Sequence, residues 1–141
     1  MNIIQLTVFI ENEAGRLLPL TGALADNNIS IKSICVADTT EYGLVRLIVD
    51  QPGKAVKCLK EKGFSVRDTE ITAVEMVNVP GGLHKVVEAV SEAGINIEYM
   101  YSFFGEKSGM CCAGLKADDT EALTRALTQK GFRVLSQDDI Q

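Results

Sequence analysis

The chain repeats one pattern of residues, and this repeat limits the folds open to it. The run from Asn12 to Leu17 (Asn-Glu-Ala-Gly-Arg-Leu) returns 66 residues later as the run from Asn78 to Leu83 (Asn-Val-Pro-Gly-Gly-Leu). A repeat of this length is a small domain rather than one turn of a solenoid. The sequence therefore predicts two modules, residues 1–69 and 70–141, each with one copy of a strand–loop–helix element.

The first copy contains a regular alternation of predicted strands and helices. Residues 3–10, 29–37 and 42–50 are rich in strand formers, and a fourth strand is expected from Phe64. A change of apolar phase within residues 29–37 predicts a β-bulge there. Residues 39–41 are polar and are expected to form a hairpin connection. One helix is predicted after Gly15, with Leu17, Leu20 and Leu24 on one face, and another between Pro52 and Gly63.

The second copy repeats this order. Strands are expected at residues 71–78, 95–104, 110–116 and 132–135, with helices at 81–93 and from Asp118 to Gly131 and a turn at 105–109. Asp118 and Glu121 have the spacing of a capping box. Leu83, Val86, Val87 and Val90 form one apolar stripe. Each copy is thus β-α-β-β-α-β, which predicts an α+β protein made of two ferredoxin-like modules, with antiparallel sheets and helices on one face.

Composition excludes several classes of protein. Hydrophobic residues make up 46% of the chain, enough for a sizeable core, yet no apolar run is long enough to span a membrane. The first residues lack the basic segment of a signal peptide, so we expect a cytoplasmic protein. The net charge of −5 argues against a nucleic-acid partner, and Lys54, Lys57 and Lys60 are expected to form a solvated helix face.

The four cysteines predict no metal site and no cofactor. Cys35, Cys58, Cys111 and Cys112 lack the spacing of metal ligands. Small side chains of this type are usually buried in proteins of a reducing compartment. A redox or metal role is the alternative that the sequence leaves open.

The repeated loop is where binding chemistry is expected. Gly15 and Gly81 allow a sharp turn and a close approach of a ligand to the backbone. The helix that follows offers N–H groups and a partial positive charge, which suit a carboxylate or a phosphate. Asn12 and Asn78 add a side-chain acceptor and two donors each. An α-amino acid matches this set of groups, although the same residues also form an ordinary turn and helix start.

At this point the chain resembles a known family. The pattern Asn78-x-Pro80-Gly81-x-Leu83, followed by Gly94-Ile95-Asn96-Ile97, is similar to the signature of ACT domains, small regulatory modules that bind amino acids. The resemblance covers essentially the whole chain as two consecutive modules. The first copy departs from the pattern, with Ala14 in the place of the usual proline and Ser30 in the place of Asn96.

The resemblance implies two binding sites, each shared between the modules. In ACT domains that pair side by side, the loop of one module and the second strand of its partner hold the effector together. Carried over to this chain, one site would join Asn12, Ala14, Gly15 and Leu17 to Asn96 and Ile97. The other would join Asn78, Pro80, Gly81 and Leu83 to Ser30 and Ile31. Because asparagine forms more hydrogen bonds than serine, the two sites are expected to differ in affinity or specificity.

The leading hypothesis is a non-catalytic sensor that binds a free amino acid and signals to a separate enzyme or regulator. The sequence names neither the amino acid nor the partner, and it leaves pairing into a homodimer open. Two alternatives remain: an RNA-binding module of the same strand order, and a small enzyme. The acidic charge disfavours the first, and the lack of a catalytic motif disfavours the second.

For two further groups of residues, the sequence leaves two interpretations open. His84, the one histidine, lies beside the second loop and is expected to be an exposed helix residue, with a ligand contact as the alternative. Tyr99, Tyr101 and Phe103 alternate with Met100 and Phe104 along one strand. One of these two faces should pack on helices, and the other either packs in a core or lines an interface or pocket.

Overall fold

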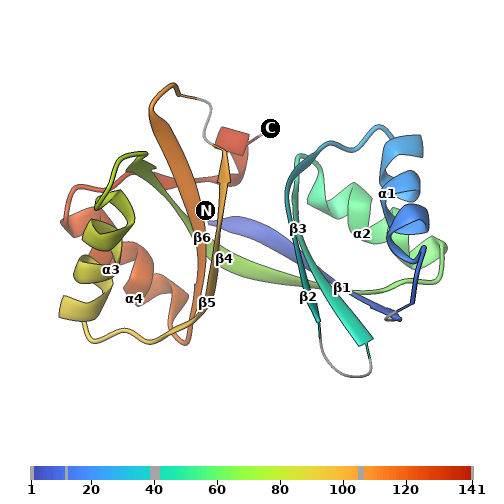
Figure 1. The fold of residues 1–141 in the computed structure, drawn as a ribbon, viewed down its shortest axis with the longest axis horizontal. Helices are drawn as coiled ribbons and strands as arrows, with labels where there is room; N and C mark the ends of the chain where they lie inside the picture. Colours follow the sequence, from blue (N-terminus) through green and yellow to red (C-terminus); the bar gives the residue numbers. More distant parts are fainter. Residues whose placement is uncertain (1, 12, 39–41, 105–106, 141) are drawn as a thin grey trace. The chain divides into compact units, whose positions relative to one another are not determined.

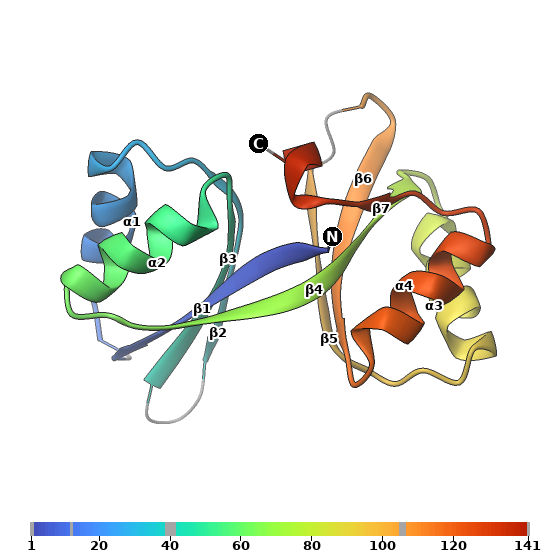
Figure 2. The same cartoon turned by 180° about the vertical axis from the view of Figure 1, so that it is seen from behind.

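Two separate units make up the structure, a computed structural model that describes residues 2–11, 13–38, 42–104 and 107–140. We call Ile4–Thr69 the first module and Glu70–Asp139 the second module. Residues 2–3 belong to the second unit and residue 140 belongs to the first. Figures 1 and 2 show each module as a sheet with two helices on one face.

In the first module, three long strands and the start of a fourth form an antiparallel sheet. The elements are β1 (Ile3–Glu11), α1 (Leu17–Asp26), β2 (Ile31–Asp38), β3 (Tyr42–Val49), α2 (Pro52–Glu61) and the first part of β4 (Ser65–Val77). The strand order is β2-β3-β1-β4. The register of β2 against β3 shifts between Ile31 and Ser33, which confirms the predicted bulge.

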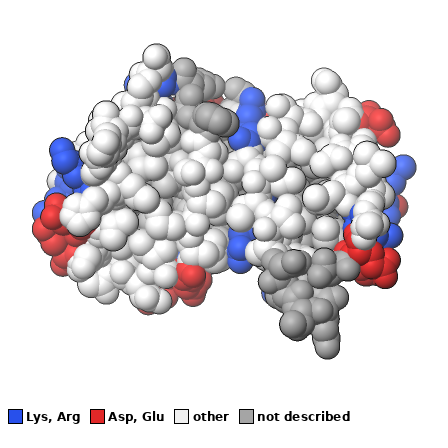
Figure 3. All heavy atoms as spheres, viewed as in Figure 1, with Lys and Arg blue, Asp and Glu red and all other residues white. Residues whose placement is uncertain are grey.

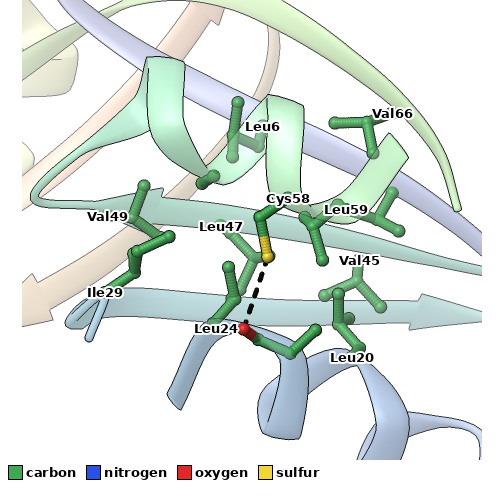
Figure 4. Close-up of a cluster of buried hydrophobic side chains, with 13 residues drawn as sticks. Leu6, Leu20, Leu24, Ile29, Val45, Leu47, Val49, Cys58, Leu59 and Val66 are labelled. Carbon is green, nitrogen blue, oxygen red and sulfur yellow. Dashed lines mark hydrogen bonds between the residues drawn. The ribbon is translucent and has the colours of Figure 1, made fainter. Parts of the chain in front are cut away.

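The core of the first module lies between this sheet and its helices (Figure 4). Leu6 and Leu47 come from the sheet, and Leu20 and Leu24 from α1; all four are fully buried. Cys58 of α2 is buried beside them, and its thiol lies 3.3 Å from the carbonyl oxygen of Ala23. This cysteine acts as a small core side chain, as the sequence predicted.

The second module repeats the arrangement but ends in a short strand and a 3-10 helix. Its elements are the last part of β4, α3 (Gly82–Glu92), β5 (Ile97–Phe104), β6 (Met110–Ala117), α4 (Thr120–Gln129), β7 (Val134–Leu135) and a 3-10 helix (Gln137–Ile140). β6 lies between β4 and β5, and β7 pairs with β4. Val86, Val90, Leu123 and Leu127 of the helices are buried against the sheet. The predicted α+β fold of two ferredoxin-like modules is therefore confirmed.

Several element predictions were wrong in detail. The fourth strand of the first copy and the first strand of the second were expected as separate strands, but β4 runs through residues 65–77 without a break. The polar residues 68–70 join the strand because alternate positions of a strand can face solvent. The last strand, expected over residues 132–135, is only Val134–Leu135.

The helix starts also differ from the prediction. The N-cap of α4 is Asp119, whose carboxylate accepts a hydrogen bond of 3.0 Å from the N–H of Ala122, and not Asp118. Leu17, Leu83 and Val87 were expected on buried stripes, yet they are 37%, 44% and 38% exposed. The stripes on α1 and α3 are therefore narrower than the sequence suggested.

Candidate functional site

The two repeated loops adopt the sharp turn that their glycines permit. Gly15 has φ +81° and Gly81 has φ +86°, a left-handed conformation that other residues adopt at a cost. A Cβ atom at either position would meet nothing within 4 Å. The space above both glycines is thus open to a ligand. Asn12, the predicted side-chain partner in the first loop, lies outside the described residues.

The helices that follow these loops begin without a side-chain cap. α1 has Arg16 at its N-cap and α3 has Gly81, and no side chain at either N-cap accepts a hydrogen bond from the first turn. Neither first turn contains an acidic residue. In α4, by contrast, Asp119 caps the helix and Glu121 stands in the first turn. The N-termini of α1 and α3 therefore offer N–H donors and a positive dipole end to an anion.

A small cavity lies beside each loop. The cavity of the first module, about 180 Å³, is lined by Gly15, Arg16 and Leu17 of the loop and by Val36 and Gly43 of the sheet. The cavity of the second module, about 170 Å³, is lined by Pro80, Gly81 and Gly82 together with Lys85 and Phe132. Each is large enough for part of an amino acid, and each lies beside one of the two repeated loops.

The structure also adds residues that the sequence prediction missed. Lys85 follows Gly81 by one helical turn, so its position in the cavity could have been found from helix spacing. Phe132 and Val36 come from distant parts of the chain. No local sequence pattern predicts that Phe132 and Val36 lie there, because only the fold brings them to the loops.

The two loops differ most at the position that follows the left-handed glycine. Gly82 is buried against β4, and its N–H donates to the carbonyl oxygen of Val79 at 3.0 Å. The equivalent residue of the first loop is Arg16, whose Nη2 atom lies 3.9 Å from Oε2 of Glu11. The first loop therefore has a cation at this position, next to Glu11 and Glu13 of the same cavity, whereas the second loop has a buried glycine there.

The remaining predicted site residues lie far from the loop of their own module. In the first module, β1 ends at Glu11, opposite Tyr42, whereas β2 begins at Ile31, opposite Val49. The loop and Ile31 are thus separated by the length of β3, roughly 23 Å at about 3.3 Å per residue. Ser30 is exposed, and its N–H donates to the carboxylate of Asp50 at 2.9 Å.

The second module has the same separation. β4 ends at Val77, opposite Met110, and β5 begins at Ile97, opposite Ala117. Asn96 is exposed and Ile97 is partly exposed. Each module thus brings its loop residues together at one end of its sheet and holds its second-strand residues at the other end.

The other residues singled out from the sequence lie on the surface or in the core, as structural residues do. The side chain of His84 is 77% exposed, with Nε2 at 4.0 Å from Oε2 of Glu88, as expected for a solvent-facing helix residue. Met100 packs on the helical core of the second module, while Tyr99, Tyr101 and Phe103 are partly exposed on the opposite face of the sheet. On the visible face of this module, Figure 3 shows mainly uncharged atoms over β5.

The part of the chain that the structure describes contains no cluster of three or more His, Cys, Asp or Glu residues able to hold a metal ion. Among the same residues, no helix is long and apolar enough to cross a membrane. All four cysteines are free thiols, and Cys112 is buried like Cys58.

Comparisons with known proteins bear on the family and the fold of the chain. A family model described as an ACT domain pair matches residues 1–141. The crystal structure of protein BT0572 from Bacteroides thetaiotaomicron is 35% identical, with a TM-score of 0.92, over 99% of this chain and 96% of that chain. A search of curated proteins finds no match.

More distant solved structures share the fold. The regulatory subunit of aspartate kinase from Thermus thermophilus, in its ligand-free form, is 23% identical with a TM-score of 0.67. The alignment covers 93% of this chain and 94% of that subunit. The same subunit from Thermus flavus is 21% identical with a TM-score of 0.63, over 92% of each chain.

Proposed function

Because the chain belongs to the family of ACT domain pairs, we propose that it is a non-catalytic regulatory protein that binds a free amino acid. One observation carries this proposal: both repeated loops combine a left-handed glycine with a helix whose first turn has no side-chain cap. The carboxylate of an amino acid would accept hydrogen bonds from these N–H groups, and the positive helix end would stabilise its charge.

Each site would be completed by the other module. The loop of a module and its own second strand are too far apart to hold one amino acid, as the strand registers indicate. We therefore retain the pairing in which Asn12, Ala14, Gly15 and Leu17 act with Asn96 and Ile97. In the related site, Asn78, Pro80, Gly81 and Leu83 act with Ser30 and Ile31. The exposed leucines at both loops would contact the ligand or the completing residues.

The output of this sensor would be a change in a separate enzyme or regulator of amino-acid metabolism. The similarity to regulatory subunits of aspartate kinase supports a partner of this kind. A ligand that binds one arrangement of the two modules more tightly than another shifts the population toward it. The partner, or a second copy of the chain, would bind one of these arrangements preferentially.

A thermal-shift screen of the twenty amino acids tests the proposal. A specific ligand should stabilise the folded protein by about 2.7 kcal/mol at a hundredfold excess over its dissociation constant. Sodium chloride at the same ionic strength is the control for nonspecific salt effects. If no amino acid raises the melting temperature above this control, the sensor hypothesis is wrong.

A double-mutant cycle tests the sharing of sites. Titration calorimetry on Asn12→Ala, Asn96→Ala and the double variant should give a coupling free energy of about 1 kcal/mol. The pair Asn12 and Ser30, which belongs to different proposed sites, is the matched control and should be additive. Additivity of Asn12 and Asn96 would contradict the shared site while leaving amino-acid binding intact.

A further inference from the structure

We propose that the first module has a second binding site, a groove along α1 that takes a small anion with a carboxylate or phosphate group. This groove is distinct from the loop cavity and has a volume of about 430 Å³. It goes beyond the proposed function, because its ligand is held by the side chains of Arg16 and Lys62 and not by the backbone N–H groups that follow Gly15 and Gly81.

The groove lies between one face of α1 and the turn that follows α2. Pro19, Gly22, Ala23 and Asp26 line it from α1, with the i, i+3, i+4, i+7 spacing of a single helix face. Lys62, Gly63 and Phe64 line the other side. Arg16 stands at the end of the groove nearest the loop. α1 and α2 lie side by side (Figure 2).

The second module has an ion pair at the equivalent place. By the repeat, Glu88 and Glu92 of α3 correspond to Gly22 and Asp26, and Lys130 corresponds to Lys62. Nζ of Lys130 lies 2.6 Å from Oε2 of Glu92. The hydrogen bond and charge of Glu92, with a smaller contribution from the charge of Glu88, raise the pKa of Lys130. Here the lysine is satisfied by the protein itself.

The first module lacks this arrangement. Where the second module has Glu88, the first has Gly22, which has neither a carboxylate nor a side chain. Asp26 is one methylene shorter than Glu92. Among the residues that the structure describes, no ion pair joins Lys62 to Asp26. Among the same residues, the ion pair of Arg16 is the long contact of 3.9 Å with Glu11. Two cations therefore line an open groove with a single carboxylate, and the carboxylate of Glu11, outside the lining, makes only a long contact with one of the cations. An anion could form shorter, charge-assisted hydrogen bonds with both.

The apolar lining points to an anion with an organic body. Pro19 and Phe64 offer apolar surface beside the two cations. A phosphate ester or an organic acid would place its charged group between Arg16 and Lys62 and its carbon atoms against these side chains. The two ligand sources share the same anionic chemistry and can be separated by experiment.

Titration of the full-length protein, labelled with nitrogen-15, tests the site. The probes are inorganic phosphate and succinate, each added at constant ionic strength because salt screens exposed charges. We expect shifts of the Gly22 and Gly63 amides. A response to phosphate alone assigns a phosphate ligand, and a response to succinate alone assigns a carboxylate ligand. Shifts confined to the Gly15 and Gly81 amides would overturn the proposal.

Variants that copy the second module provide the control. Lys62→Ala should weaken the binding of the responding probe about tenfold, since one charge-assisted hydrogen bond is lost. The double variant Gly22→Glu with Asp26→Glu should abolish binding by pairing Lys62 as Lys130 is paired. Glutamate favours a helix more than glycine, so this variant is expected to fold. Unchanged affinity in both variants would overturn the site, whatever the outcome of the amino-acid screen.

Discussion

The carbonyl oxygen of Val77 lies where a side chain on Gly82 would have to begin. A Cβ atom on Gly82 would stand 2.0 Å from that oxygen, far inside van der Waals contact. The obstacle is backbone of β4 and not the flexible end of a side chain, so it cannot move aside cheaply. The second loop is therefore closed onto its strand in a way that only glycine allows.

Gly82→Ala should destabilise the second module. Because overpacking against backbone forces the loop to shift, we expect the free energy of unfolding to fall by about 3 kcal/mol. Urea denaturation measures it. Gly22→Ala in α1 is the matched control, since a Cβ there meets nothing within 4 Å, and it should raise stability by up to about 1 kcal/mol. Equal stability of the two variants would show that the loop relaxes freely.

Leu17→Ser and Leu83→Ser should separate binding from stability. Both leucines are at least one-third exposed, at 37% and 44%, so each change should alter the free energy of unfolding by about 0.5 kcal/mol or less. Calorimetry should show weaker binding of the amino acid found in the screen. Leu20→Ala, at a fully buried position, is the contrasting variant and should cost about 2–5 kcal/mol. Undiminished ligand affinity in both serine variants would remove these leucines from the site.

Asp119→Ala should cost more stability than Asp118→Ala. Asp119 accepts the N–H of Ala122 at 3.0 Å and so caps α4, and loss of such a cap costs about 1 kcal/mol. Asp118 is exposed, and the hydrogen bond that it accepts among the described residues comes from the adjacent N–H of Asp119, also at 3.0 Å. Thermal unfolding of the two variants compares these roles directly. The reverse ranking would reinstate the N-cap predicted from sequence.

Asp139 should make the protein more sensitive to acid. Hydrogen bonds from the backbone N–H and the hydroxyl of Ser136, with the nearby charge of Arg133, hold the pKa of Asp139 below its ordinary value of 3.8. The unfolded chain therefore binds this proton more readily, and the stabilisation present above about pH 4 is lost as the pH falls through the folded-state pKa.

Asp139→Asn tests this dependence. Its stability should fall less steeply than that of the original protein when urea denaturation is repeated from about pH 5 down to about pH 2. The exposed neighbour Asp138 provides a matched variant, Asp138→Asn. If the pH dependence of the free energy of unfolding changes equally in both variants, the Ser136 contacts contribute nothing specific.

Much of the fold followed from periodic patterns. The spacing of Leu20 and Leu24 predicted α1 because burial on one face leaves a regular trace in the sequence. The apolar alternation of β1 predicted the strand, although Gln5 and Thr7 on its other face are buried as well. The bulge in β2 was visible as a change of apolar phase. The width of a buried stripe was not visible, because exposure of Leu83 and Val87 depends on what packs above the helix.

The repeat by itself determined the two-module fold, the family resemblance and the two glycine loops. A left-handed turn favours glycine at these positions, so the local sequence determines the conformation of each loop. Only the tertiary structure brought Phe132 and Val36 to the loops, placed Ser30 and Asn96 at the far ends of their sheets and opened the groove beside Lys62. These features join residues distant in sequence, and such contacts depend on strand order and helix packing, which leave no local pattern.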